Sequence, residues 1–237
     1  MLPGQNEKGS TMSVDYCVVS IGTLSHNKLW GENVPVRTAH ATTTLVRDGK
    51  RAILVDPSLP VAALAARLGE RTGLAVSAVT DVFCTTLRPV HRRSLEAFAH
   101  AHWWCSQAEL EAYRGHLEDL RASAGRLNDE QNKLAEEDLK LLGRFHAAPD
   151  KFTEQVHLYP LAGPSVGSAG LLLTPATTTV VIAGDAALTA DHVQRGMVWE
   201  GSHDVEAAAE SFRDLLEIAD LIIPGHDNLM LSPGRLI

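Results

Sequence analysis

The sequence predicts an α/β fold, on three observations. Apolar, β-branched runs alternate along the chain with segments of helical periodicity, which is the order typical of α/β proteins. Several of these runs end in glycine and a polar residue, as strands do where they open into loops. The composition is globular, because 45% of the 237 residues are hydrophobic and 21% are charged. Such a chain builds one sizeable domain or two small ones.

The first part of the chain supplies strands and helices in alternation. The β-branched runs on either side of Asp48-Gly49 predict a hairpin, which Pro57 and Pro60 end. The stretch VAALAARLGERTG has helical periodicity and a glycine at its end. The elements expected here are strands at 16–21, 42–56, 78–86 and 102–105 and helices at 61–73 and 92–101.

Residues 107–146 have apolar residues at helical spacing and predict a helical hairpin inserted into the α/β frame. Asn128, followed by acidic residues, is a suitable N-cap for the second helix, and Ala124-Gly125 separates the two helices. Such a pair serves packing or a dimer contact, and a lid over a ligand is the alternative. The apolar stripes are Leu110, Tyr113, Leu117 and Leu120 in the first helix and Leu134, Leu139, Leu142 and Phe145 in the second.

The second half returns to alternating strands and helices. Asp204 is a good N-cap for a helix at 204–220. No linker, repeat or low-complexity segment appears, so we expect a single domain at 14–237, including the insertion, after a flexible tail at 1–13. The strands expected here are 154–160, 170–175, 177–185 and 221–227.

Charge and cysteine usage narrow the class of protein. The formal net charge of -8 disfavours nucleic acid as the main partner, since phosphate binding needs a basic face. No apolar run reaches the length of about 18 residues that predicts a membrane span, and the N-terminus lacks the pattern of a secretory signal. Cys17, Cys84 and Cys105 have no metal-type spacing, so we expect reduced core cysteines in a cytoplasmic protein. The partner that we expect is a small-molecule substrate or ligand.

Three apolar strands each lead to a potential metal ligand. VFCTT leads to His91, VVIAG to Asp185 and LIIPG to His226. Ligands in α/β folds lie beyond the carboxyl ends of strands, where loops open a crevice that the sheet keeps rigid. Two imidazoles and one carboxylate on such an edge can bind one divalent metal, either zinc or a non-haem iron or manganese ion. The alternative is that each is only a turn or capping residue.

At these residues the chain resembles the metallo-β-lactamase superfamily of metal-dependent hydrolases, over roughly residues 16–231. ILVDPS (53–58) resembles the family's early strand ending in aspartate, and AGDAALTADHVQRG (183–196) resembles its Gly-Asp segment. IIPGHD (222–227) resembles the final motif, whose histidine is a ligand. The resemblance implies an αββα sandwich of two mixed β-sheets flanked by helices, with the helical insertion at about 107–146.

The family's signature, Thr-His-x-His-x-Asp-His, is degenerate in this chain. If His91 matches its last histidine, then Thr86, Arg88 and Val90 stand where the other three ligands belong. The motif Pro-Gly-His-Thr-x-Gly-Ser matches AGPSVGS (162–168), with Pro164 in place of the histidine. Four of the ligands that the resemblance implies are therefore missing.

The missing ligands belong mainly to one metal. In the family, the first metal takes the two earlier signature histidines and the histidine of the Pro-Gly-His motif, all absent here. His91 and His226 remain from the second metal's set, and the bridging Asp185 also remains. The resemblance therefore implies a mononuclear site of His91, Asp185 and His226, with His40 as the candidate auxiliary ligand, and not a conventional dinuclear zinc β-lactamase.

Arg88 stands at one of the lost positions and brings a permanent positive charge there. Its guanidinium can pair with Asp185, or with a carboxylate or phosphate of a substrate. Because breaking a buried ion pair costs roughly 3–5 kcal/mol, Asp185 needs either this cation or a metal beside it. The alternative is that Arg88 points into solvent together with Arg92 and Arg93.

Three functions remain open. The first is a metal-dependent hydrolase-like protein in which a metal-activated water attacks the substrate, with Asp185 and Arg88 as catalytic residues and Arg88 orienting an anionic part of the substrate. The second is a catalytically inactive binding or scaffold protein, and the third is a non-hydrolytic iron or manganese enzyme with the same ligands. The apolar stripes of the insertion also predict a homodimer with residues 107–146 at or near its interface.

Overall fold

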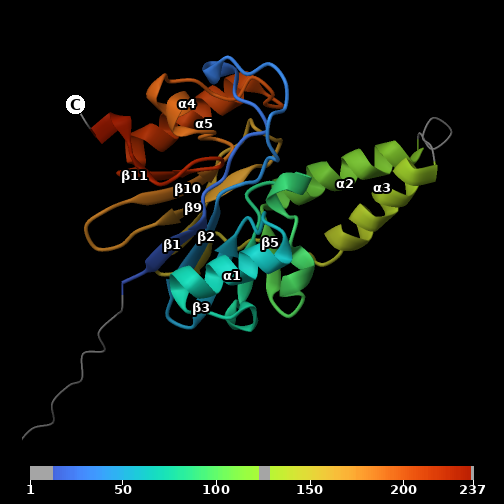
Figure 1. Cartoon of the computed structure of the whole chain (residues 1–237), viewed down its shortest axis with the longest axis horizontal. Helices are drawn as coiled ribbons and strands as arrows, with labels where there is room; N and C mark the ends of the chain where they lie inside the picture. Colours follow the sequence, from blue (N-terminus) through green and yellow to red (C-terminus); the bar gives the residue numbers. More distant parts are fainter. Residues whose placement is uncertain (1–12, 123–128, 236–237) are drawn as a thin grey trace, which may run out of the picture.

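The computed structural model describes residues 13–122 and 129–235 and contains two six-stranded β-sheets (Figure 1). The sheets pack face to face, and helices cover their outer faces. This confirms the αββα sandwich of two mixed sheets. The predicted tail at 1–13 lies outside the described residues except for Ser13, and so does the predicted cap Asn128.

The first sheet has the strand order β1-β2-β3-β4-β5-β6. β2 pairs antiparallel with β1 and β3, as the predicted hairpin requires, and the remaining neighbours are parallel. Parallel neighbours bring the carboxyl ends of β3, β4 and β5 to one edge of the sheet. The strands are β1 (Asp15–Ser20), β2 (Thr43–Asp48), β3 (Arg51–Val55), β4 (Asp81–Phe83), β5 (His102–Cys105) and β6 (Phe145–Ala147).

The second sheet has the order β12-β11-β10-β9-β8-β7. Only β10 and β11 are parallel in it, so the carboxyl ends of these two strands also meet at one edge. The strands are β7 (Lys151–Thr153), β8 (Val156–Pro160), β9 (Ala169–Leu173), β10 (Val180–Gly184), β11 (Leu221–Pro224) and β12 (Met230–Leu231).

The helices confirm most of the sequence periodicity. Asp204 caps α5 by accepting a hydrogen bond from the Ala207 N–H. The longer helices are α1 (Val61–Thr72), α2 (Gln107–Ala122), α3 (Asp129–Leu142) and α5 (Val205–Ile218), and the shorter ones are α4 (Ala190–Gln194), η1 (Lys28–Trp30), η2 (Val76–Ala78), η3 (Pro89–His91), η4 (Leu95–Phe98) and η6 (Pro233–Arg235). Among the residues described, none of these helices combines the length and apolarity needed to cross a membrane. The cytoplasmic location stays a prediction.

The core has three apolar layers, and the strands alternate between them. Ile53 and Val55 of β3 face the second sheet, whereas Leu54 between them packs with α1. In β10, Ile182 faces the first sheet and Val181 packs beneath α5. Period-two alternation of this kind buries both faces of each sheet, which makes the strand ends rigid supports for the loops above them.

The helix predicted at 92–101 is wrong, because only the short turn η4 forms there. The Ser94 N–H donates to the Pro57 carbonyl at 2.9 Å, and the Arg92 side chain donates to the Leu87 carbonyl at 2.6 Å. The Ser94 bond takes a backbone donor away from a helical pattern, and the backbone bonds that follow span three residues, such as Ala97 N–H to the Ser94 carbonyl, instead of the four of an α-helix. Leu95 and Phe98 are still buried, so the apolar spacing reports burial rather than a helix.

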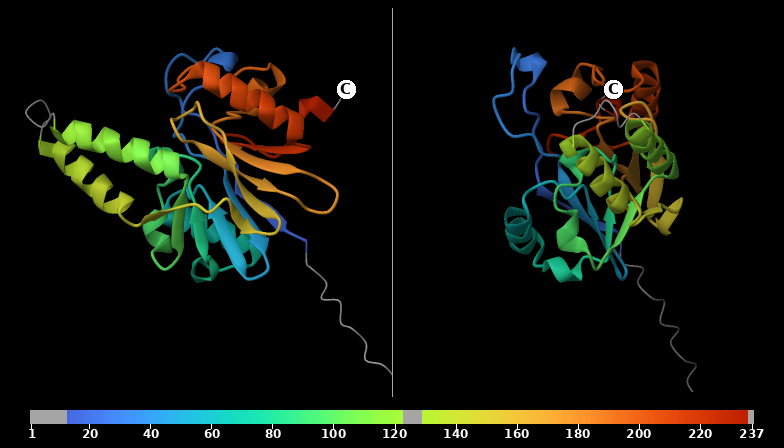
Figure 2. Two further views of the ribbon diagram at one scale, coloured as in Figure 1. Left: turned by 180° about the vertical axis from the view of Figure 1, so that it is seen from behind. Right: turned by 90° about the vertical axis from the view of Figure 1, so that its right-hand side faces the viewer.

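The insertion forms the predicted helical hairpin, which projects from the side of the sandwich (Figure 2). Its stripes pack within the chain: Leu110, Leu117 and Leu142 are buried and join the apolar layer of the first sheet. Two details of the predicted second stripe are wrong. Phe145 belongs to β6, because α3 ends at Leu142, and Leu134 is 57% exposed.

Candidate metal centre

His91, Asp185 and His226 come together at the edge where β4, β10 and β11 end. One potential ligand atom of each lies within 4.8 Å of the other two, and all three residues are buried. Gly184 allows this approach, because it has a φ of 54° and a Cβ there would lie 2.5 Å from Thr85 Oγ1. The three ligands predicted from the strand ends therefore form one cluster.

Hydrogen bonds on the far side of each imidazole orient both rings. His91 Nδ1 lies 3.0 Å from the Asp56 carboxylate. His226 Nδ1 lies 3.0 Å from the His40 carbonyl oxygen and 3.3 Å from that of Thr23. Carboxylate and carbonyl oxygens only accept, so Nδ1 carries the proton in both rings. When such a ring is neutral, it presents the lone pair of Nε2, the atom that binds a metal, to Asp185.

Asp185 Oδ1 lies 3.2 Å from both of these Nε2 atoms. Asp185 Oδ1 and His91 Nε2 are nevertheless buried without a hydrogen-bond partner. Lone pairs converging in this way need a proton or a metal ion between them, and the donor set of two histidines and one carboxylate fits a divalent metal.

The pKa values of His91 and Asp185 are shifted by their mutual interaction. Burial by itself would lower the pKa of His91, but the charges of Asp185 and Asp56 raise this pKa to about 10. Burial would raise the pKa of Asp185, but His91 and His226 hold it well below its usual range. A proton and a metal are therefore alternatives for the same imidazole nitrogen.

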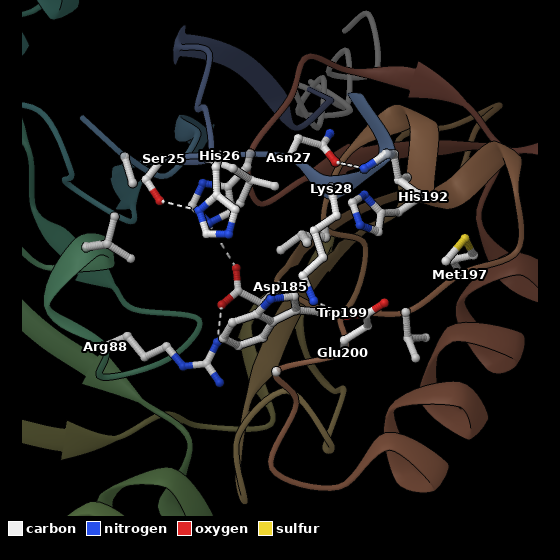
Figure 3. Close-up of a pocket in the computed structure, with 18 residues that line it drawn as sticks. Ser25, His26, Asn27, Lys28, Arg88, Asp185, His192, Met197, Trp199 and Glu200 are labelled. Carbon is white, nitrogen blue, oxygen red and sulfur yellow. Dashed lines mark hydrogen bonds and ion pairs between the residues drawn. The ribbon is translucent and has the colours of Figure 1, made fainter. Parts of the chain in front are cut away.

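Arg88 lies inside the crevice, so the alternative of a solvated side chain is wrong (Figure 3). Its Nη1 donates to Asp185 Oδ2 at 2.7 Å, and its Nη2 donates to the Pro164 carbonyl oxygen. Its guanidinium also stacks on Trp199, 4.1 Å from the ring centroid. Arg88 therefore binds the carboxylate oxygen that the two imidazoles leave free.

A cavity of about 490 Å³ opens over the cluster. Arg88, Asp185 and His226 line its base, as the close-up shows for the labelled Arg88 and Asp185 (Figure 3). Apolar side chains form much of the remaining wall, namely Leu24, Leu29, Val90, Leu188, Met197, Val198 and Trp199. The cavity can therefore hold a small molecule that has an apolar part and a polar group at the cluster.

A second cavity, of about 650 Å³, lies between α2 and the segment 164–166. Arg88 and Gly201 line both cavities, so the guanidinium stands between them. Tyr113, His116 and Asp119 of α2 also line the second cavity. Helix α2 of the insertion therefore lines a cavity that adjoins the candidate metal centre at Arg88.

The remaining positions singled out in the sequence do not supply metal ligands. The His40 ring has its Nε2 2.9 Å from the Ile21 carbonyl and lies outside the cluster, so the structure gives no support to the auxiliary role. Only its backbone oxygen contributes, by accepting from His226. Cys84 and Cys105 are buried and Cys17 is half-buried, and all three are free thiols. Burial raises the pKa of the Cys84 and Cys105 thiols, which suits core residues.

Three residues near the site were not assigned a role from the sequence. Asp56 orients His91 from a strained backbone, with the only positive φ, 49°, among the described non-glycine residues. Trp199 supports Arg88, and Glu109 of α2 is buried beside Thr86. The aspartate that follows the apolar run in ILVDPS is a usable signal for Asp56. Glu109 and Trp199 carry no local signal of this kind.

No protein-family model matches the sequence, and no curated protein matches it. The structure, in contrast, is similar to several solved structures. One is a Thermotoga maritima protein described as a candidate metallo-β-lactamase, with a TM-score of 0.67 and 16% sequence identity. The alignment covers 93% of this chain and 100% of that one.

Two hydrolases are similar at the same level. The hydrolase AbOPH of the β-lactamase superfamily has a TM-score of 0.61 and 15% identity, with 93% of this chain and 91% of that chain covered. An N-acyl homoserine lactone hydrolase with its product bound at the catalytic metal centre has a TM-score of 0.61 and 18% identity, with 91% and 94% covered. Identities this low establish the fold and not the activity. The strand order, the layers and these neighbours together identify the chain as a protein of the metallo-β-lactamase fold.

Proposed function

We propose that this chain is a metal-dependent hydrolase-like protein that works with a single divalent metal held by His91, Asp185 and His226. The observation that carries the proposal is the convergence of two imidazole Nε2 atoms on one buried carboxylate oxygen, two of these atoms having no hydrogen-bond partner. A divalent metal, when bound, lowers the pKa of a coordinated water toward about 7 and so supplies a nucleophile at neutral pH.

The residues of the chain contribute binding and orientation. Asp56 and the backbone carbonyl of His40 keep the two imidazoles in the tautomer that a metal needs. Arg88 lines both cavities, and its permanent charge suits an anionic or strongly polar group of the substrate. The apolar wall then suits the rest of a small ester or lactone, the class of substrate that one structural neighbour is named for.

A metal-free binding protein is the second candidate, and one observation favours it. The ion pair between Arg88 and Asp185 already compensates the buried carboxylate, so the site keeps a partner for this charge without a metal. A non-hydrolytic iron or manganese enzyme remains the third, because its usual ligands are also two histidines and one carboxylate.

The test combines metal content with hydrolysis by the same preparation. Protein purified without chelator is analysed for transition metals and assayed on a panel of aryl esters and lactones, before and after removal of metal by dialysis against a chelator. We expect about one equivalent of metal and hydrolysis that falls with the metal and returns when it is added back. His226→Ala should lose both, while His146→Ala, at an exposed histidine of β6, should keep both.

The outcomes separate the three candidates. Protein that takes up no zinc, iron or manganese and hydrolyses nothing supports the binding protein. One equivalent of iron or manganese with no hydrolysis on any substrate of the panel supports the non-hydrolytic enzyme.

A further inference from the structure

Glu109 is a buried carboxylate at the base of the insertion. It lies in the first turn of α2, and only 4% of its surface is exposed. Four donors surround its two oxygens. Oε1 accepts from Thr86 Oγ1 at 2.7 Å and from the Leu87 N–H at 2.9 Å, and Oε2 accepts from Ser165 Oγ at 2.7 Å and from the Gly167 N–H at 3.2 Å. Its charge is therefore dispersed over hydrogen bonds instead of a salt bridge.

The four donors come from two loops that build the candidate centre. Thr86 and Leu87 belong to the loop after β4, which continues through Arg88 to His91. Ser165 and Gly167 belong to the loop between β8 and β9, which also contains Pro164. Each carboxylate oxygen holds one loop. The carboxylate thereby helps to set the separation of the two loops, together with a direct contact of 3.3 Å from Ser165 Oγ to Thr86 Oγ1.

Arg88 spans the same two loops from inside the crevice. It leaves the first loop, and its Nη2 donates to the Pro164 carbonyl of the second while Nη1 reaches Asp185. A guanidinium is planar and rigid, so it can satisfy both acceptors only if the loops keep their distance. Glu109 therefore controls a distance on which the Arg88 geometry depends.

Helix α2 lies directly on the second loop. A Cβ at Gly167 would lie 2.0 Å from the Glu109 backbone nitrogen, so only glycine allows this contact. Ser106, just before α2, donates its hydroxyl to the Gly167 carbonyl oxygen. The start of α2 is thus attached to the loop between β8 and β9, although the far end of the insertion projects away from the sandwich.

We propose that Glu109 is a positioning residue that holds the two loops so that Arg88 reaches Asp185 and Pro164 at once, and that this is a function of the helical insertion. The two loops are those in which Thr86, Arg88 and Pro164 replace the expected ligands of a first metal. An anionic cross-link from α2 and a cation from Arg88 connect them in this chain. The inference goes beyond the proposed hydrolysis, because it concerns the placement of Arg88 whether or not a substrate is turned over.

The test follows the Arg88 side chain by proton–nitrogen correlation spectra of the arginine guanidinium groups, assigned with Arg88→Lys. In the wild type we expect resolved Arg88 Nη signals, because both nitrogens are hydrogen-bonded and the group is stacked on Trp199. Glu109→Gln keeps the size of the side chain but turns one acceptor into a donor, which leaves a backbone N–H of Leu87 or Gly167 unsatisfied. We expect the Arg88 signals to shift toward those of free arginine and the unfolding constant to rise roughly 5- to 150-fold.

The control is Glu118→Gln, at an exposed glutamate of the same helix, which should change neither reading. If Glu109→Gln does not fold, Thr86→Val and Ser165→Ala each remove one hydroxyl that donates to Glu109, one from each loop, and are expected to shift the same signals. Wild-type Arg88 signals that are already averaged would overturn the proposal. So would a destabilised Glu109 variant whose Arg88 signals keep their wild-type positions, since Glu109 would then contribute stability alone.

Discussion

Arg88 and Asp185 form an ion pair inside the candidate centre, with Nη1 2.7 Å from Oδ2, while the other oxygen of Asp185 faces two imidazoles. The buried Asp185 carboxylate thus binds a permanent cation through Oδ2 and forms part of a potential metal site through Oδ1. Because both partners are positive, Arg88 stabilises the carboxylate when no metal is present and opposes the metal when one binds. This relationship has opposite consequences for stability and for metal affinity.

The first prediction therefore concerns Arg88→Met. Without metal, this variant should lose about 1–3 kcal/mol of unfolding free energy, less than for a fully buried ion pair, because the charge-assisted hydrogen bond that it removes is only partly buried on the Arg88 side. It should also bind zinc more tightly, by roughly tenfold, because a neighbouring positive charge is gone. Denaturant titrations in chelator and competition with a metal-binding dye measure the two effects. Arg93→Met, at an exposed arginine nearby, is the control, and weaker zinc binding by Arg88→Met would contradict the electrostatic argument.

Metal stoichiometry is the second prediction. Crystals soaked in zinc should show a single anomalous peak, between His91, Asp185 and His226. The reason is that Thr86, Arg88 and Pro164 offer no second set of ligands: Thr86 hydrogen-bonds Glu109, and Arg88 cannot coordinate a cation. Two well-occupied peaks at the site would show that the ligand assignment is wrong.

The third prediction is that β-lactamase activity is absent or very weak. A dinuclear centre uses two metals to generate the nucleophile and to stabilise the leaving group, and the described residues contain a single cluster of potential ligands, His91, Asp185 and His226. Hydrolysis of a chromogenic cephalosporin by zinc-loaded protein is the measurement. Turnover in the usual enzyme range of about 1–1000 per second would contradict the prediction.

The fourth prediction is a homodimer. Fewer apolar residues are available for its interface than the sequence suggested. The stripes of α2 and α3 are largely covered within the chain, but Leu134 of α3 is 57% exposed on the projecting hairpin. If the hairpin forms the interface, Leu134→Glu should convert a dimer to a monomer, whereas Leu231→Glu, at a 61% exposed leucine of β12, should not. Light scattering at micromolar concentration measures the mass. A monomeric parent protein refutes the dimer, and a dimer that survives Leu134→Glu has its interface elsewhere.

Much of the architecture was predictable from the sequence, because strands and long helices are encoded by local periodicity. The β-branched runs located β2, β3, β10 and β11, and the ends of such runs located His91, Asp185 and His226. The Arg88 contact with Asp185 was one of the predicted possibilities, since the motif alignment put Arg88 at a lost ligand position and a buried carboxylate needs a cation or a metal beside it. The same local reasoning failed at 92–101, where apolar spacing marked burial without a helix.

The sequence by itself determined the alternation of strands and helices and the three residues of the candidate metal cluster, since a strand end carries its next residues to a known edge of a sheet. The layers of the sandwich followed from the resemblance to the metallo-β-lactamase superfamily. Only the tertiary structure decided what supports the three residues of the cluster. Glu109 is 23 residues from Thr86 and 56 from Ser165, yet one carboxylate binds both. No local pattern marks such a residue, because an acidic side chain in the first turn of a helix is ordinarily exposed. Its burial depends on donors that only the folded chain brings together.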